Sequence, residues 1–82
     1  APLGRGSTGR SVPKTDQERQ VLRLVKDYPE EGTVVPLRKG EITDPRWPEE
    51  GWVKMEFVLD GVNIHYLRNQ ITGWVDDFKF KE

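Results

Sequence analysis

The residues best suited to chemistry lie in the last third of the sequence. They occupy the polar positions of segments in which apolar and polar residues alternate. A histidine side chain ordinarily titrates near neutral pH, so His65 could act as a general acid or a general base. Glu56 could complement it, and Lys54 and Lys79 could hold a phosphate group. This set suits RNA cleavage by attack of a ribose 2′-hydroxyl on the adjacent phosphate. A base takes the hydroxyl proton, cations stabilise the phosphoryl oxygens, and an acid protonates the leaving oxygen.

Each of these residues also has an ordinary structural explanation. A lone histidine on the polar face of a sheet is often a plain surface residue. The lysines could be solubilising charges or could protect a sheet edge, and Glu56 could be the cross-strand ion-pair partner of a lysine. The sequence has one histidine and no cysteine, which excludes multi-histidine and thiolate metal sites. The acidic residues are scattered, so we expect no metal and no other cofactor.

Three predicted strands must bring these groups together. Residues 52–59 and 62–67 flank Asp60-Gly61, a strong hairpin signal, and residues 74–81 follow a longer turn at 69–73. Side chains alternate between the faces of a strand, so one set faces inward: Val53, Met55, Phe57, Leu59, Val62, Ile64, Tyr66, Phe78 and Phe80. The outer face then collects Lys54, Glu56, Asn63, His65, Asp77, Lys79 and Lys81, with a β-bulge at 75–77 as an alternative that shifts the phase by one residue.

One helix is predicted to cover the inner face of this sheet. Thr15 and Glu18 form a capping box, and Pro29 and Gly32 end the helix. The apolar residues of the helix follow the spacing of one buried face: Val21, Leu22, Leu24, Val25 and Tyr28. Because Val34 and Val35 precede a proline, we predict that they form a short edge strand. We predict an ordered functional loop at residues 38–51. The expected fold class is α+β, with one main helix packed on a small twisted antiparallel β-meander.

Length and charge limit the organisation of the chain. Its 82 residues suffice for one domain, which we expect at 14–82 after a flexible basic arm or linker at 1–13. No apolar run is long enough to span a membrane and no signal peptide is visible, so we expect a soluble domain with no membrane insertion. The formal net charge of −1 is unusual for a nucleic-acid binder, but local potential can still steer a phosphate backbone. The candidate RNA-binding residues are Arg5, Arg10, Lys14, Arg46, Trp47, Arg68 and Lys81.

Two of these RNA-binding candidates have structural alternatives. Trp47 could stack on a base, or it could anchor the loop at 38–51 to the body of the domain. Arg46 could hold phosphate, or it could form a loop salt bridge with Asp44.

Several segments together resemble the C-terminal toxin domains of contact-dependent growth inhibition and polymorphic toxin systems, found at the ends of haemagglutinin-like and Rhs-type proteins. They are Gly4 to Arg10 with Pro13, Asp44-Pro45-Arg46-Trp47, Gly51-Trp52-Val53-Lys54-Met55, Gly61-Val62-Asn63-Ile64-His65-Tyr66, Thr72-Gly73 and Asp77-Phe78-Lys79-Phe80-Lys81. Within such systems, a helix followed by a meander is similar to the barnase/EndoU/colicin/RelE group of ribonucleases. The positions that match, and that the resemblance implies as catalytic candidates, are Lys54, His65, Thr72 and Lys79.

The resemblance implies a metal-independent ribonuclease that cleaves tRNA by transesterification to a 2′,3′-cyclic phosphate. It also implies a cognate immunity protein that covers the active face, so that the domain is a monomer or a toxin–immunity heterodimer. Delivery would be as part of a larger secreted or cell-surface protein, with action in the cytoplasm of the target bacterium. The residues themselves are also compatible with two other functions. One is a non-catalytic module of immunity, adaptor or RNA-binding type, and the other is a metal-dependent DNase, which the missing histidines disfavour.

Overall fold

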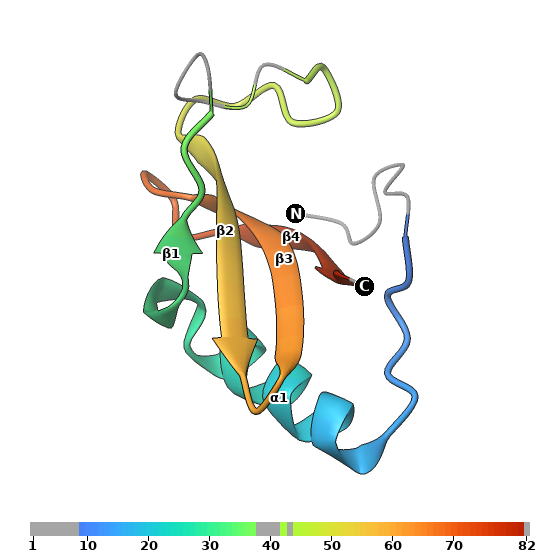
Figure 1. Cartoon of the computed structure of the whole chain (residues 1–82). Helices are drawn as coiled ribbons and strands as arrows, with labels where there is room; N and C mark the ends of the chain where they lie inside the picture. The colour runs from blue at the N-terminus through green and yellow to red at the C-terminus, as the bar shows by residue number, and fades with distance from the viewer. Residues whose placement is uncertain (1–8, 38–41, 43, 82) are drawn as a thin grey trace.

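The computed structural model describes residues 9–37, 42 and 44–81. Within these residues, helix α1 (Asp16–Asp27) and a short 3₁₀ helix (Pro29–Glu31) precede four antiparallel strands. The strands are β1 (Thr33–Val34), β2 (Trp52–Leu59), β3 (Val62–Asn69) and β4 (Val75–Phe80), and they lie side by side in chain order (Figure 1). The predicted α+β meander is confirmed, and the predicted short edge strand adds a fourth strand to it. None of the helices in the described part of the chain is long and apolar enough to cross a membrane.

The start of α1 follows the predicted capping box. Thr15 is the N-cap, and its hydroxyl oxygen accepts a hydrogen bond from the Glu18 N–H at 3.0 Å. The Glu18 carboxylate accepts a hydrogen bond from the N–H of Lys14 at 2.7 Å. In the usual capping box the donor is the N–H of the N-cap residue itself, which here is Thr15. At the other end Tyr28 donates its N–H to the carbonyl of Leu24, and Pro29 opens the 3₁₀ turn. Local chemistry therefore sets both ends of the helix.

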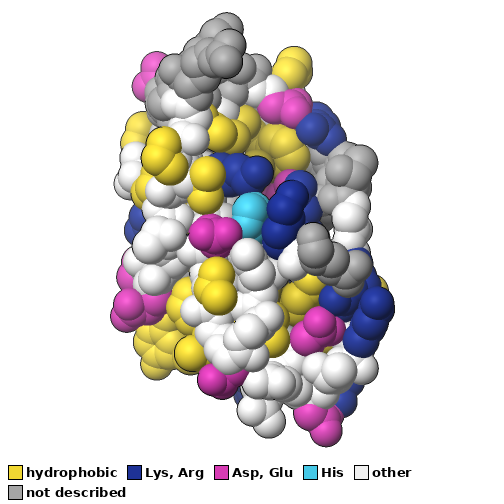
Figure 2. Space-filling view, viewed as in Figure 1, with side chains coloured by type: hydrophobic (Ala, Val, Ile, Leu, Met, Phe, Trp, Pro, Cys, Tyr) yellow, Lys and Arg dark blue, Asp and Glu magenta, His cyan; other side chains and the backbone are white. Residues whose placement is uncertain are grey.

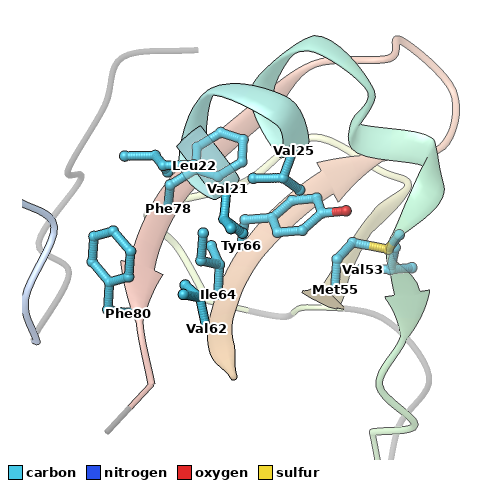
Figure 3. Packing of buried hydrophobic residues seen from close by; sticks show 10 residues of the cluster. All are labelled: Val21, Leu22, Val25, Val53, Met55, Val62, Ile64, Tyr66, Phe78 and Phe80. Carbon is cyan, nitrogen blue, oxygen red and sulfur yellow. The ribbon is translucent and has the colours of Figure 1, made fainter. Parts of the chain in front are cut away.

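The main core lies between α1 and the inner face of the sheet (Figure 3). The helix contributes Val21, Leu22 and Val25, and the rings of Tyr66 and Phe78 stack beneath it with their centroids 4.9 Å apart. The Tyr66 hydroxyl donates to the carbonyl of Pro29 at 2.5 Å, and burial raises the pKa of this tyrosine. This contact joins the 3₁₀ turn to the sheet.

The predicted burial of the helix face is wrong at two positions. Leu24 is 38% exposed and Tyr28 is 52% exposed. They lie with Phe57 and Leu59 of β2 along a groove of about 400 Å³, beyond the part of the sheet that α1 covers. Leu59, predicted to face the core, therefore lies at its rim.

Residues 9–13, the end of the predicted arm or linker, dock on the domain. Arg10 forms a β-bridge with Phe80, whose N–H donates to the Arg10 carbonyl at 2.8 Å. The Arg10 guanidinium lies 4.5 Å from the centre of the Phe80 ring, and its two terminal nitrogens donate to the two oxygens of Glu18 at 2.9 Å each. This segment therefore joins β4 to the start of α1. Residues 1–8, including Arg5, lie outside the described residues.

The Arg10–Glu18 pair predicts a pH effect on stability. Hydrogen bonds from Arg10 and then from the Lys14 N–H lower the pKa of Glu18 from 4.5 to about 2. A depressed carboxyl pKa contributes stability above the unfolded value, and that contribution is lost as pH falls through the folded value. We expect Glu18→Gln to melt at a lower temperature than the wild type at pH 7, and the difference to vanish between pH 4.5 and about 2. Thermal melts across this range, with Glu30→Gln as an exposed control, check this. A difference that persists at pH 2 would contradict it.

Candidate active site

The outer face of the sheet brings three of the predicted catalytic residues into one row. Glu56 is paired with His65 across β2 and β3, and His65 is paired with Lys79 across β3 and β4. The Nε2 atom of His65 lies 3.0 Å from Oε2 of Glu56. Figure 2 shows the single histidine near the centre of this face, between acidic and basic side chains. The prediction that Glu56 of β2 and His65 of β3 lie on the same face of the sheet is thus confirmed.

A pocket of about 190 Å³ opens beside this row. It is lined by Ile42, Asp44, Arg46, Trp47, Lys54, His65, Tyr66, Leu67, Asp77 and Lys79. The set contains three of the predicted catalytic residues, Lys54, His65 and Lys79, and Glu56 is bonded to one of them. His65 is only 8% exposed, so its imidazole belongs to the wall of the pocket rather than to the open surface.

A second apolar cluster contributes Ile42, Trp47 and Leu67 to the lining of the pocket. Trp47, Trp52 and Leu67 are buried together, with Ile42 packed against them. Trp47 is 4% exposed, and its indole N–H donates to Oδ2 of Asp76 at 3.0 Å. The prediction that Trp47 stacks on a base is therefore wrong, because both its ring and its polar atom are engaged within the protein. The alternative is confirmed for the described part of the loop, residues 42 and 44–51, which Trp47 anchors to the body of the domain.

A β-bulge in β4 shapes the remaining side of the pocket. Leu67 is paired with Asp76 and His65 with Lys79, so Tyr66 faces two residues of β4 where a regular ladder would have one. Asp77 takes the left-handed conformation, with φ of 60°. Its N–H donates to Oδ1 of Asp76 at 2.7 Å, and Asp76 is fully buried. The bulge lies in the predicted place, but Asp76 and Asp77 were not among the predicted site residues. Strand phase had placed Asp77 on the outer face with His65, and the sequence signal for Asp76 was its place in the acidic pair at that bulge.

The charges around the pocket are held in distinct ways. Hydrogen bonds from His65 and then Asn63 lower the pKa of Glu56, so this carboxylate is charged at neutral pH beside the imidazole. Hydrogen bonds from Arg46 lower the pKa of Asp44 to about 2, and the same contact raises the pKa of Arg46. The predicted loop salt bridge of Asp44 and Arg46 is present at 2.5 Å. Much of the charge of Arg46 is thereby offset before any ligand arrives.

Two polar atoms of the pocket residues are buried without a hydrogen-bond partner among the described residues. They are Nδ1 of His65 and Oδ1 of Asp77. Asp77 is 7% exposed, and its other oxygen lies 3.9 Å from Nζ of Lys79, beyond hydrogen-bond length. Buried polar atoms are normally bonded, so such exceptions mark sites that a ligand or water completes.

The remaining predicted residues lie away from the pocket. Thr72 is exposed in the turn between β3 and β4, where its hydroxyl oxygen accepts from the Trp74 N–H at 3.1 Å. Arg68 is paired with Val53 and Val75, and so lies on the face that carries α1. Lys14 precedes α1 and Lys81 follows β4, and neither lines the pocket. Arg10 is committed to Glu18 and Phe80. The structure therefore does not bring Thr72 to the proposed catalytic residues, and it places these four RNA-binding candidates away from the pocket.

The turn that carries Thr72 is organised by a buried amide. Asn69 is fully buried, and its Oδ1 accepts from the N–H groups of Ile71 and Thr72 at 2.9 and 3.0 Å. Its Nδ2 donates to the carbonyl of Glu50 at 2.7 Å. The side chain thus connects the β3–β4 turn to the loop that bears Trp47.

Among the described residues, no three histidine or acidic side chains are grouped so that they could hold a metal ion. Comparison of the chain with protein-family models, with curated proteins and with solved structures finds no match.

Proposed function

We propose that this domain is a metal-independent endoribonuclease, and that its substrate class is tRNA. The observation that carries the proposal is the row of Glu56, His65 and Lys79 across three strands, with Lys54 beside it in one pocket. A proton donor oriented by a carboxylate, with two cations in the same pocket, supplies groups that phosphodiester transesterification uses.

In the proposed reaction, Lys54 and Lys79 hold the non-bridging oxygens of one phosphodiester. Glu56 keeps the imidazole of His65 oriented through their contact at 3.0 Å. The ribose 2′-hydroxyl loses its proton to a base in the pocket, its oxygen forms a bond to phosphorus as the bond to the 5′-oxygen breaks, and His65 gives its proton to that leaving oxygen. The products are a 2′,3′-cyclic phosphate and a 5′-hydroxyl end.

We propose further that the domain is a toxin of contact-dependent growth inhibition or polymorphic toxin systems, as its sequence resemblance implies. It would be delivered as part of a larger secreted or cell-surface protein and act in the cytoplasm of the target bacterium. A cognate immunity protein would bind over the outer face of β2, β3 and β4, where the pocket opens. Support for this comes from the sequence motifs, because three of their four catalytic candidates, Lys54, His65 and Lys79, line the pocket.

The experiment is an incubation of the purified domain with tRNA in the presence of EDTA, followed by analysis of the new 3′ ends. We expect discrete fragments that end in a 2′,3′-cyclic phosphate. Lys79→Ala should lower the cleavage rate about 10²- to 10³-fold, the usual effect of removing one donor to a developing anionic oxygen. Lys81→Ala is the matched control, since it lies two residues further along, is exposed and does not line the pocket, and it should cleave at the wild-type rate.

Other outcomes identify other functions. Cleavage that requires a divalent cation would replace the proposal with a metal-dependent nuclease. Binding of tRNA without cleavage, by a domain that is harmless when expressed in bacteria, would replace it with a non-catalytic module.

A further inference from the structure

We infer that Asp77 is the general base of this reaction, the group that takes the proton from the attacking 2′-hydroxyl. The inference rests on the proposed ribonuclease function and names a catalytic residue that sequence patterns did not select. It follows from the arrangement of the titratable groups around the pocket.

An in-line displacement at phosphorus needs two proton-transfer groups on opposite sides of the phosphate. One group faces the attacking oxygen and the other faces the leaving oxygen. Glu56 and His65 are bonded to each other at 3.0 Å, so they form one unit and can serve only one side. A second acceptor must come from elsewhere in the pocket wall.

Asp77 fits that second position better than the other pocket residues. Asp44 is held by Arg46 through side-chain and backbone hydrogen bonds, so its lone pairs are engaged. Lys54 and Lys79 are cations suited to the phosphate oxygens. Asp77 is a buried carboxylate in the pocket wall, and one of its oxygens has no donor among the described residues. Its other oxygen lies 3.9 Å from Nζ of Lys79, next to the place where the phosphate would bind.

The bulge explains how this carboxylate reaches the pocket. Asp76 is paired with Leu67, a residue that lines the pocket, so regular alternation would turn Asp77 toward α1 and Phe78 away from it. The extra residue instead leaves Phe78 in the core and places both Asp77 and Lys79 in the pocket wall. The left-handed conformation that this requires is one that aspartate and asparagine tolerate better than most residues.

The proton balance of the step is complete. The Asp77 carboxylate takes the 2′-hydroxyl proton while the 2′-oxygen bonds to phosphorus. The bond from phosphorus to the 5′-oxygen breaks, and His65 protonates that oxygen. Asp77 then holds a proton and His65 has lost one, and exchange with water restores both.

The test compares Asp77→Asn and His65→Ala on two substrates, one all-oxygen and one with sulfur in place of the leaving 5′-oxygen. A thiolate leaves without being protonated, so it removes the need for the acid but not for the base. We expect both variants to cleave the oxygen substrate about 10²- to 10⁴-fold more slowly than the wild type. On the sulfur substrate His65→Ala should recover most of its rate, and Asp77→Asn should stay slow.

Matched variants separate chemistry from folding. Asparagine and glycine both accept the left-handed backbone, so Asp77→Asn and Asp77→Gly should share the same loss of rate while they keep the wild-type circular dichroism spectrum. Asp60→Asn changes the other described aspartate with positive φ, in the β2–β3 turn outside the pocket, and should cleave normally.

Three results would overturn the assignment in different ways. Wild-type rates for Asp77→Asn would exclude Asp77 as the base and leave the ribonuclease standing. Recovery of Asp77→Asn on the sulfur substrate would make it the acid instead. Absence of cleavage by the wild type would remove the proposed function itself.

Discussion

Replacement of His65 by alanine is expected to lower kcat for RNA cleavage about 10²- to 10⁴-fold, the usual contribution of a positioned general acid. KM should change little, because Lys54 and Lys79 would still hold the phosphate. Glu56→Gln should lower kcat by a smaller factor. It weakens the 3.0 Å hydrogen bond that orients the imidazole, but the imidazole ring itself remains. Single-turnover kinetics on a defined tRNA measure both effects separately from product release.

Arg68→Ala is the control for this substitution. It changes a polar residue of the same strand, three positions from His65, on the face that carries α1. It should leave kcat unchanged. If His65→Ala cleaves as fast as Arg68→Ala, the histidine is a structural residue of the sheet and the proposed site is wrong.

The Asp76→Ala variant is expected to lose about 2–6 kcal/mol of unfolding free energy, from about 1–3 kcal/mol for each of the two buried donors that it leaves without an acceptor. Asp76 is fully buried and accepts from the Trp47 indole at 3.0 Å and from the Asp77 N–H at 2.7 Å. Its removal leaves both donors in the interior without that partner, and unpaired buried donors are costly. Urea denaturation followed by far-ultraviolet circular dichroism measures the change.

A double-mutant cycle isolates one of these contacts. Trp47→Phe removes the indole N–H but keeps an aromatic ring, and should cost about 1–3 kcal/mol. The double variant should then lose less than the sum of the two single losses, because the same hydrogen bond is removed in each. Strict additivity would show that Asp76 does not stabilise the loop through Trp47.

The parts of the site on β2 and β3 could be predicted because alternation is a property of the extended backbone. The Asp60-Gly61 turn fixes the register of the hairpin, and the register fixes which residues share a face. Glu56 and His65 therefore had to meet. The same rule places Arg68 with Tyr66 on the inner face, so alternation alone could have excluded Arg68 from the RNA-binding set.

The rest of the pocket depends on contacts between residues far apart in the sequence. Trp47 and Asp76 are 29 positions apart, and no local pattern indicates that one bonds the other. Charge alone also could not show that Arg10 is committed to Glu18 and Phe80. At Leu24 and Tyr28 the helical spacing indicated the face that meets the sheet, but the two side chains line an open groove beside Phe57 and Leu59 and stay partly exposed.

The amide of Asn69 has a consequence for residues that never touch a substrate. It forms hydrogen bonds with the backbone of Ile71, Thr72 and Glu50. A strained or enlarged β3–β4 turn would therefore displace the loop that carries Trp47. Changes in this turn should alter the shape of the pocket, and with it the RNA that the proposed ribonuclease would select, without altering its proposed proton-transfer groups.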